Sequence, residues 1–293
     1  MAARAVRCAL EQRDVETEVV VVDDGSAERA PSRRPFLDER VRVVRHPTAR
    51  GLSGARNRGV AEARTEWVAF LDDDDLWAPE KLHSQLRAAR EMDAEFAYCG
   101  AYQVDADLRV RARRRATPVE ALPIALLEYN AIPAGGSNIL VKREVLVSHG
   151  VFDESLPHLC DWDLSLRLTD VAVRMAALDD PLIAYTQHED NMGASARRLV
   201  PEWRRFLRKH RALARRVGRS FRSDKVIAWY VWRLQLGGRR WRAAITGLLW
   251  GLRLRNLELI RGRAAKILRP SATVGLLPPV RPGPAWLPRP PHR

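Results

Sequence analysis

Four consecutive aspartates at positions 72–75 are the residues of this sequence with the most direct chemical meaning. They follow an apolar run of strand length at residues 67–71. Because side chains alternate along an extended strand, Asp72 and Asp74 are expected to point into one cleft while Asp73 points away. Two convergent carboxylates suit an octahedral Mg²⁺ or Mn²⁺ that shares its other positions with phosphate oxygens and water. The alternative is a solvated acidic turn that precedes the helix expected from Pro79, since acidic groups favour helix N-termini.

The elements around this cluster alternate between strand and helix up to about residue 187. Continuous β-branched or apolar runs predict strands at 18–22, 41–44, 67–71, 96–104 and 138–141, and apolar spacing predicts helices at 53–64 and 79–92, with Ser53 as an N-cap. This order favours an α/β sheet flanked by helices. Ligands of such sheets bind beyond the carboxyl ends of the strands, where Asp23 and Asp24 lie as well as the four aspartates.

Four stretches of this chain, in order, resemble glycosyltransferase family 2, the inverting enzymes with the GT-A fold. The stretches are VVVVDDGSAERA, RHPTARGLSGARNRGVAEARTEWVAFLDDDDLWAPEKL, GGSNILVKREVLVSHGVFDESLPHLCDWDLSLRL and YTQHEDNMGAS, and they cover roughly residues 3–196. The resemblance implies transfer of a sugar from a UDP- or dTDP-linked donor to a hydroxyl of a saccharide or lipid-linked acceptor. Cell-surface polysaccharide or glycolipid synthesis is the implied setting.

The resemblance also implies a role for individual residues. Asp161 matches the general base that takes the proton of the acceptor hydroxyl, although it could simply begin a helix at 161–171. Cys160 stands where the family usually has glutamate. The implied nucleotide-sugar ligands are Asp23, Asp24, Arg56, Asp72 and Asp73. The implied ligands of Mn²⁺ or Mg²⁺ are Asp74, Asp72 and His188.

The family domain normally opens with a strand that lies inside the sheet, and this sequence begins within the helix that follows it. We therefore expect a domain that lacks this strand, either because the reading frame starts upstream of Met1 or because the product is truncated. Two strands would then each have an edge without a hydrogen-bonding neighbour.

Charge divides the chain at about residue 197. Residues 1–196 hold 25 Lys/Arg against 33 Asp/Glu, and residues 197–269 hold 22 against 3, so the net charge of +14 comes from the C-terminal third. We expect three segments: the catalytic domain 1–196, a basic helical appendage 197–269 with helices at 201–219, 226–236 and 240–255, and a flexible tail 270–293 with eight prolines. The basic tryptophan-rich appendage predicts either an anionic membrane surface or packing on the acidic domain, and no recognition motif favours nucleic acid.

Other features narrow the class of protein. Three widely spaced cysteines form no disulfide framework, and no apolar run is long enough for a membrane span or a signal peptide, so a cytoplasmic enzyme is expected, at most peripheral on the inner face of the plasma membrane. Two other functions remain open. One is a degenerate, non-catalytic binding or scaffold protein, and the other is a metal-dependent nucleotidyltransferase, which would usually carry a glycine-rich phosphate loop.

Overall fold

The structure, a computed structural model, describes residues 1–27, 35–187, 196–217 and 283–288. These residues fall into two units, which are treated separately. The first comprises Met1–Leu126, Asn130–His188 and Pro279–Arg293, and the second comprises Leu127–Tyr129 and Glu189–Pro278.

The first unit contains both helices and strands, and its N-terminal half repeats a pattern of two strands followed by a helix. The helices are α1 (Ala2–Leu10), α2 (Gly51–Glu62), α3 (Lys81–Glu91), α4 (Leu122–Ala125), the 3₁₀ helix η1 (Gly135–Asn138), α5 (Arg143–His149) and α6 (Cys160–Asp170). The strands are β1 (Val19–Asp23), β2 (Val41–Arg45), β3 (Trp67–Ala69), β4 (Leu76–Trp77), β5 (Phe96–Val104), β6 (Val110–Arg114), β7 (Leu140–Lys142) and β8 (Met175–Thr186).

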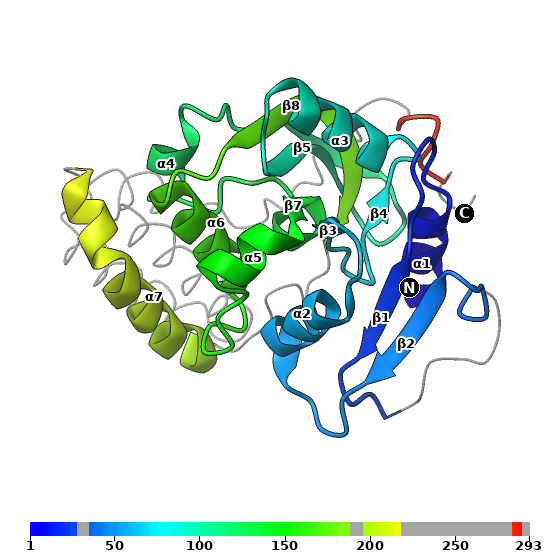
Figure 1. The fold of residues 1–293 in the computed structure, drawn as a ribbon, viewed down its shortest axis with the longest axis horizontal. Helices are drawn as coiled ribbons and strands as arrows, with labels where there is room; N and C mark the ends of the chain where they lie inside the picture. Colours follow the sequence, from blue (N-terminus) through cyan, green and yellow to red (C-terminus); the bar gives the residue numbers. More distant parts are fainter. Residues whose placement is uncertain (28–34, 188–195, 218–282, 289–293) are drawn as a thin grey trace, which may run out of the picture. The chain divides into compact units, whose positions relative to one another are not determined.

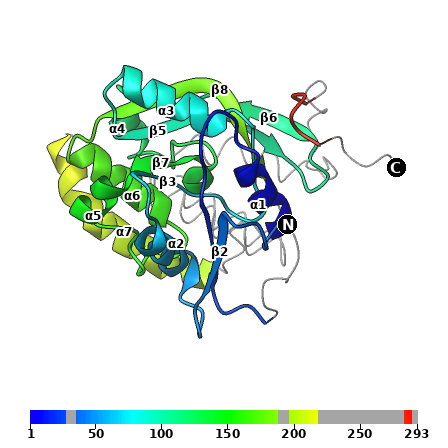
Figure 2. The ribbon, with the colours of Figure 1, turned by 45° about the vertical axis from the view of Figure 1, so that its right-hand side comes forward.

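The core of this unit is a mixed sheet in the order β3-β7-β5-β8-β4, with β6 paired to β5 as a hairpin arm, which is labelled in Figure 2. Strand β8 runs parallel to β5, and β7 runs antiparallel to it. Nearly every side chain of β5 is buried, which explains its unbroken apolar sequence. Helix α3 packs on β5 and β8, and Figure 1 shows it lying along them. The expected α/β sheet flanked by helices is therefore confirmed.

Strand β5 changes its register against β8 at Gly100. A Cβ atom on Gly100 would lie 2.7 Å from the carbonyl oxygen of Asp179 and 3.0 Å from that of Arg114. Glycine is therefore required here because two neighbouring backbones approach too closely for any side chain.

Strands β1 and β2 form a separate parallel pair, visible in Figure 1 beside α1. Among the described residues, β1 pairs only with β2, and β3 pairs only with β7. Within the part of the chain that the structure describes, each of these two strands thus has one edge without a strand partner.

Helix α2 begins two residues earlier than the sequence predicts, and the expected N-cap is wrong. Ser53 lies inside the helix, and Arg50 is the N-cap without a capping side chain of its own. The carboxylate of Asp24 accepts hydrogen bonds from the backbone N–H groups of Arg50 and Gly51 instead. A carboxylate from a distant loop replaces the local cap, so a local pattern could not identify it.

Helix α3 begins at Lys81, two residues after the predicted start at Pro79. Its first turn is held by the side chain of Gln12, whose Oε1 accepts a hydrogen bond of 2.9 Å from the backbone N–H of Leu82. The amide of Gln12 also donates to the carbonyl of Ala78 at 2.8 Å. Helix α1 and helix α3 are therefore joined through one buried side chain.

The second unit is described at α7 (Ala196–Arg216), an amphipathic helix. Its buried side carries Trp203 stacked on Phe206 with ring centroids 5.0 Å apart, followed by His210 at 4.8 Å from the Phe206 ring. Its exposed side is basic. The helices expected at 226–236 and 240–255 lie outside the described residues. No helix in the described ranges combines the length and the apolar character needed to cross a bilayer.

Residues 283–288, within the proline-rich C-terminal segment, belong to the first unit. Leu287 is buried in a cluster with Leu76 and Val104, and the Trp286 ring lies 6.5 Å from the ring of Tyr102. An apolar pair between prolines therefore packs against the sheet.

Lys81 is a buried lysine in the interior of the sheet unit. Its Nζ atom has no hydrogen-bond partner among the described residues and lies 4.0 Å from the centre of the Trp77 ring. Burial lowers the pKa of Lys81 to about 7, although the nearby thiols of Cys8 and Cys99 oppose this shift. Burial also raises the pKa of Cys8 to about 11 and that of Cys99 to about 12, so these thiols keep their protons near neutral pH.

The substitution Lys81→Met tests this reading of the core. Between pH 7 and 9 the unfolded chain binds a proton at Lys81 that the folded chain has released, so the free energy of unfolding of the wild type rises with pH. The slope approaches about 1.4 kcal/mol per pH unit for one proton. Urea unfolding across this range should show that Lys81→Met is more stable at pH 7 and has lost this slope. Lys142→Met, at a half-exposed lysine near Glu66, should keep the wild-type slope. Equal slopes in wild type and Lys81→Met would refute the assignment.

Candidate active site

The four aspartates form a turn rather than the end of a strand. Strand β3 ends at Ala69, and the turn is closed by a hydrogen bond of 3.2 Å from the backbone N–H of Asp75 to the carbonyl of Asp72. The backbone N–H of Asp72 also donates to the Ser137 hydroxyl at 3.1 Å. Asp73 is exposed and Asp74 is half-buried. The outward position of Asp73 is as expected, but turn geometry sets it, because strand alternation does not extend this far.

Asp75 ties this turn to the end of β8. Its carboxylate is buried, and Oδ1 accepts a hydrogen bond of 2.9 Å from the backbone N–H of Thr186. The Thr186 hydroxyl donates in turn to the carbonyl of Asp74. Burial raises the pKa of Asp75 well above its usual value, and the charges of Asp72 and Asp74 add to this shift. The turn is followed by β4 and not by a helix, so the alternative of an acidic helix start is wrong.

Arg56, on α2, is the central cation of the site. Its side chain is 6% exposed, and Nη2 donates to Asp72 Oδ1 at 2.7 Å. Nη1 donates to the thiol sulfur of Cys160 at 3.4 Å. Burial alone would lower the pKa of Arg56, but the negative charges of Asp72 and Asp161 more than offset this and raise it. The guanidinium therefore remains charged between the Asp72 turn and the start of α6.

Two glycines make room for these charged groups. A Cβ atom on Gly136 would overlap the guanidinium of Arg56, and one on Gly135 would overlap Oδ2 of Asp161. Gly135 also has a positive φ of 50°, and the residue before it, Ala134, has φ of 59°. The absence of side chains at 135 and 136 is thus what allows Arg56 and Asp161 to lie against the same backbone turn.

Asp161 is the second residue of α6, where a negative charge is favourable near the helix N-terminus. The Asp161 side chain is half-buried. It accepts one hydrogen bond from the backbone N–H of Trp162 and one of 3.1 Å from the Asn130 amide. Cys160 beside it is buried, and burial raises the pKa of its thiol to about 11 despite the charge of Arg56. Cys160 therefore faces Arg56 as a neutral group, where the glutamate usual in the family would be an anion.

Asp23 and Asp24 lie at the carboxyl end of β1, and both already have protein partners. Asp23 accepts a hydrogen bond from the backbone N–H of Ser26 and forms an ion pair with Arg45. Asp24 binds the ring Nδ1 of His46 at 2.7 Å in addition to the two N–H groups at the start of α2. Burial would raise the pKa of Asp24, but these hydrogen bonds outweigh it and lower the pKa. Its side chain is still 22% exposed.

The residues present fit a hard divalent cation. Asp72 and Asp74 offer carboxylate oxygens at a partly exposed turn, and such oxygens are the ligands that Mg²⁺ and Mn²⁺ prefer. No three acidic, histidine or cysteine side chains converge in the part of the chain that the structure describes. Such cations are usually bound by only one or two carboxylates of the protein, and phosphate oxygens and water complete the coordination. His188, the expected third ligand, lies outside the described residues.

Three further residues support the site through contacts between distant segments. Ser137 holds the Asp72 turn, and Asn138 holds the glycine turn by binding both the N–H and the carbonyl of Cys99. Asn130 contacts Asp161 from a segment without a motif. Ser137 and Asn138 follow the two glycines directly, so the GGSN run carried a signal, whereas nothing in the sequence pairs Asn130 with Asp161.

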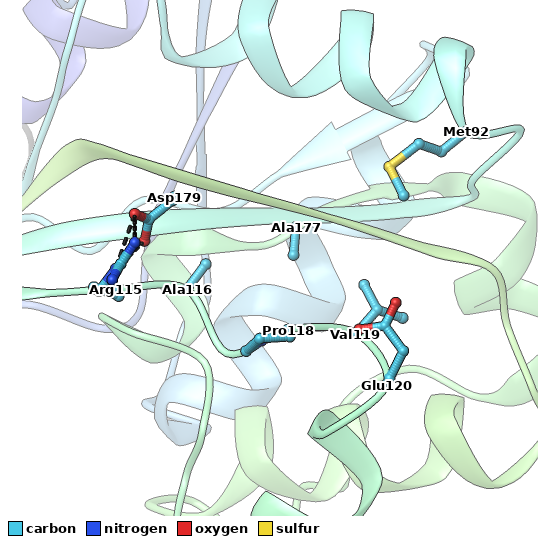
Figure 3. Close-up of a pocket in the computed structure, with 8 residues that line it drawn as sticks. All are labelled: Met92, Arg115, Ala116, Pro118, Val119, Glu120, Ala177 and Asp179. Carbon is cyan, nitrogen blue, oxygen red and sulfur yellow. Dashed lines mark hydrogen bonds and ion pairs between the residues drawn. The ribbon is translucent and has the colours of Figure 1, made fainter.

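A separate surface pocket of about 560 Å³, drawn in Figure 3, is lined by none of the candidate site residues. Its charged side chains include Arg115 and Asp179, which form an ion pair at 2.8 Å across its wall. The hydrogen bond from Arg115 lowers the pKa of Asp179. This pocket is therefore distinct from the group of charged side chains around Arg56.

The substitution Gly136→Ala tests the close packing of the site. The added methyl group would displace the Arg56 guanidinium and separate it from Asp72, and breaking a buried ion pair costs about 3 kcal/mol or more of stability. Denaturant unfolding should show this loss. Gly59→Ala is the matched control. Gly59 also lies in α2, and a Cβ atom there would meet only Val22 Cγ2, at 3.8 Å. It should raise stability by roughly 0.5–1 kcal/mol. A Gly136→Ala protein as stable as wild type would show that the site is not packed in this way.

Comparison with known proteins finds several similar sequences. The chain is 37% identical over 143 residues to the succinoglycan biosynthesis protein ExoO of Rhizobium meliloti, covering 48% of this chain and 40% of that protein. It is 25% identical over 193 residues to an Escherichia coli protein named UDP-Glc:alpha-D-GlcNAc-diphosphoundecaprenol beta-1,3-glucosyltransferase WfaP, covering 65% of this chain and 73% of that protein.

Among solved structures, the fold is similar to that of S. aureus TarS 1–349 in complex with UDP-GlcNAc. The TM-score is 0.54 at 18% identity, and the match covers 80% of this chain and 69% of that one. The chain spans less than half the length of the succinoglycan protein. The family model of Glycosyl transferase family 2 matches residues 1–150, which is half of the sequence. The sheet and helices that surround Arg56 thus form a GT-A fold, and the chain belongs to glycosyl transferase family 2.

Proposed function

We propose that this chain is an inverting glycosyltransferase that moves a sugar from a UDP- or dTDP-linked sugar donor to an acceptor hydroxyl. The observation that carries the proposal is the position of Arg56. One buried guanidinium binds Asp72 on the donor side and lies close enough to Asp161 to be affected by its charge. The Arg56 guanidinium would then hold Asp72, which binds the donor, at a fixed distance from Asp161, which activates the acceptor.

Asp161 would act as the general base. In an inverting transfer the acceptor oxygen attacks the anomeric carbon from the face opposite the diphosphate, and the hydroxyl proton passes to Asp161. Partial proton transfer in the transition state is enough for a carboxylate to act in this way. The start of α6 and the amide of Asn130 hold the carboxylate in place.

Asp74, Asp72 and His188 would hold Mn²⁺ or Mg²⁺. When bound, such a cation would stabilise negative charge on the departing diphosphate, so that no protein acid is needed there. The protein's own part is to fix the turn, through Ser137 at Asp72 and Thr186 at Asp74 and Asp75. Thr186, which binds the aspartate turn, precedes the third proposed ligand, His188, by two residues in the sequence.

Asp23, Asp24, Arg56, Asp72 and Asp73 would bind the nucleotide sugar. The exposed part of the Asp24 carboxylate would accept a hydrogen bond from the base, while its other contacts keep the loop before α2 in place. The lowered pKa of Asp24 keeps this carboxylate an acceptor over the neutral pH range. The UDP-GlcNAc complex of TarS, which has the same fold, supports a uridine nucleotide.

Isothermal calorimetry with UDP and MnCl₂ tests the donor site. The wild type should bind UDP in the presence of Mn²⁺, and Asp74→Asn should lower this affinity by roughly tenfold or more, since a charged metal ligand is lost. Asp161→Asn should keep wild-type UDP affinity and lose turnover of the sugar donor by roughly 100-fold or more, as expected for a lost general base.

The outcomes separate the competing functions. Absence of metal-dependent UDP binding would overturn the enzyme proposal and favour a scaffold protein. Release of pyrophosphate from a nucleoside triphosphate and a sugar phosphate would identify a nucleotidyltransferase. Wild-type turnover in Asp161→Asn would remove Asp161 from the role of base.

We further propose that the acceptor is a saccharide or a lipid-linked saccharide and that the protein works on the cytoplasmic side, at an anionic membrane surface. Helix α7 supports this proposal, because arginine side chains dominate its exposed side while its aromatic side chains are buried. A surface of this kind binds lipid phosphates by charge rather than by insertion. The exposed basic residues include Arg204, Arg208, Arg211 and Arg215.

Vesicle co-sedimentation tests the membrane proposal. The full chain should bind vesicles that contain phosphatidylglycerol and should not bind vesicles of phosphatidylcholine alone. The variant Arg204→Glu/Arg208→Glu/Arg211→Glu should weaken binding by at least tenfold, because each basic group near an anionic surface contributes about 1 kcal/mol. Arg87→Glu/Arg90→Glu on α3 is the control for a general change of charge. Equal loss in both variants, or binding to both kinds of vesicle, would contradict a specific role for α7.

A further inference from the structure

The two ends of the Asn130 side-chain amide have different surroundings. Nδ2 lies 3.1 Å from Asp161 Oδ2. A carboxylate oxygen can only accept a hydrogen bond, so the NH₂ group of the amide must be the end that faces Asp161. The orientation of the amide is therefore fixed by chemistry, and Oδ1 points away from Asp161.

Oδ1 of Asn130 has no hydrogen-bond partner among the described residues, although the atom is buried. A buried amide oxygen without a partner costs about 1–3 kcal/mol, so such atoms are rare in folded proteins and each one calls for an explanation. The residue as a whole is half-buried, so it lies beside Asp161 but not in the core. An oxygen of this kind accepts a hydrogen bond from a hydroxyl or an N–H group.

The backbone on both sides of Asn130 is anchored. The carbonyl of Leu126 accepts a hydrogen bond of 2.7 Å from the indole of Trp162, the residue after Asp161. The carbonyl of Ala131 accepts one of 2.8 Å from the Thr117 hydroxyl. A Cβ atom on Gly135 would lie 3.5 Å from Asn130 Nδ2, so the same glycine leaves space for both side chains. Asn130 is thus held in relation to Asp161 by its surroundings as well as by its own bond.

We propose that Asn130 positions Asp161 through Nδ2 and binds the acceptor through Oδ1. This inference rests on the proposed function. The hydroxyl that attacks the sugar donates its proton to Asp161, so Oδ1 receives its hydrogen bond from a different hydroxyl of the same molecule. Because the amide and the carboxylate are adjacent, that hydroxyl is the neighbour of the attacking one. The acceptor class is therefore a saccharide with two vicinal hydroxyl groups.

The variants Asn130→Leu and Asn130→Asp separate the two roles. Leucine has a similar shape without polar atoms, and aspartate keeps an accepting oxygen but repels Asp161. With UDP-glucose or UDP-GlcNAc as donor and methyl glycosides as acceptors, Asn130→Leu should lower kcat and raise the acceptor KM, each by roughly tenfold for one lost hydrogen bond. Asn130→Asp should lower kcat by a similar factor and leave the acceptor KM near that of wild type. UDP affinity with Mn²⁺ should be unchanged in both.

Acceptors that lack one hydroxyl provide the decisive comparison. Wild type should use the methyl glycoside deoxygenated next to the attacking hydroxyl roughly tenfold less well than the parent, and Asn130→Leu should use the two equally. Asn57→Leu is the matched control, since the Asn57 amide binds Phe152 and Glu154 and does not contact Asp161. It should lower thermal stability and keep the wild-type discrimination.

The failures are distinguishable. If wild type binds no UDP with Mn²⁺ and turns over no donor, the proposed function fails and this inference fails with it. If wild type is active but Asn130→Leu still discriminates between the two acceptors, or loses only thermal stability, the role of Asn130 is overturned and the proposed function stands.

Discussion

The structure of the site depends on a buried positive charge. Removing a guanidinium from water is unfavourable unless anions and hydrogen-bond acceptors surround it. Arg56 meets this requirement with Asp72 and the Cys160 sulfur, close to Asp161. These partners come from the turn after β3 and from the start of α6, so one ion-pair network fixes two segments that are far apart in the chain. In many proteins a buried pair adds little stability compared with apolar packing, and what it supplies is a defined geometry. Here that geometry is the separation between the donor-side carboxylate and the base.

Uncharged groups make this arrangement sterically feasible. Gly135 and Gly136 leave the space that Asp161 and Arg56 occupy, and η1 holds those glycines through Ser137 and Asn138. Asn138 is buried against β5, so the position of the site is set by the strand at the centre of the sheet. On the other side, Thr186 at the end of β8 binds the aspartate turn. Two neighbouring strands of the same sheet therefore position the turn and the glycines, which is why a site made of loops can be well defined.

Much of the fold could be predicted from the sequence, because long apolar runs such as β5 admit few other interpretations. The family motifs also brought Arg56, Asp72 and Asp161 into one site, since their order along the chain is specific. What failed had a common physical origin. The start of α2 depends on Asp24, and the four aspartates lie in a turn held by Ser137 and Thr186 rather than at the end of a strand. These are contacts between distant segments, and local periodicity carries no information about them. The contact between Asn130 and Asp161 could not be predicted for the same reason. The Asn130 segment has no repeating pattern, and Asp161 lies in another element.

The Asn138 side chain has a consequence for how the site can be observed. Along β5, the N–H of Cys99 donates to Asn138 Oδ1 at 2.8 Å, and the carbonyl of Cys99 accepts from Asn138 Nδ2. A backbone amide in the most buried strand is therefore protected by a side chain of the glycine turn and not by the next strand. Hydrogen–deuterium exchange at that single amide would follow opening of the turn, while its neighbours in β5 would follow unfolding of the sheet. The difference in exchange rate between adjacent amides would report, without any ligand, how often the site opens in the folded protein.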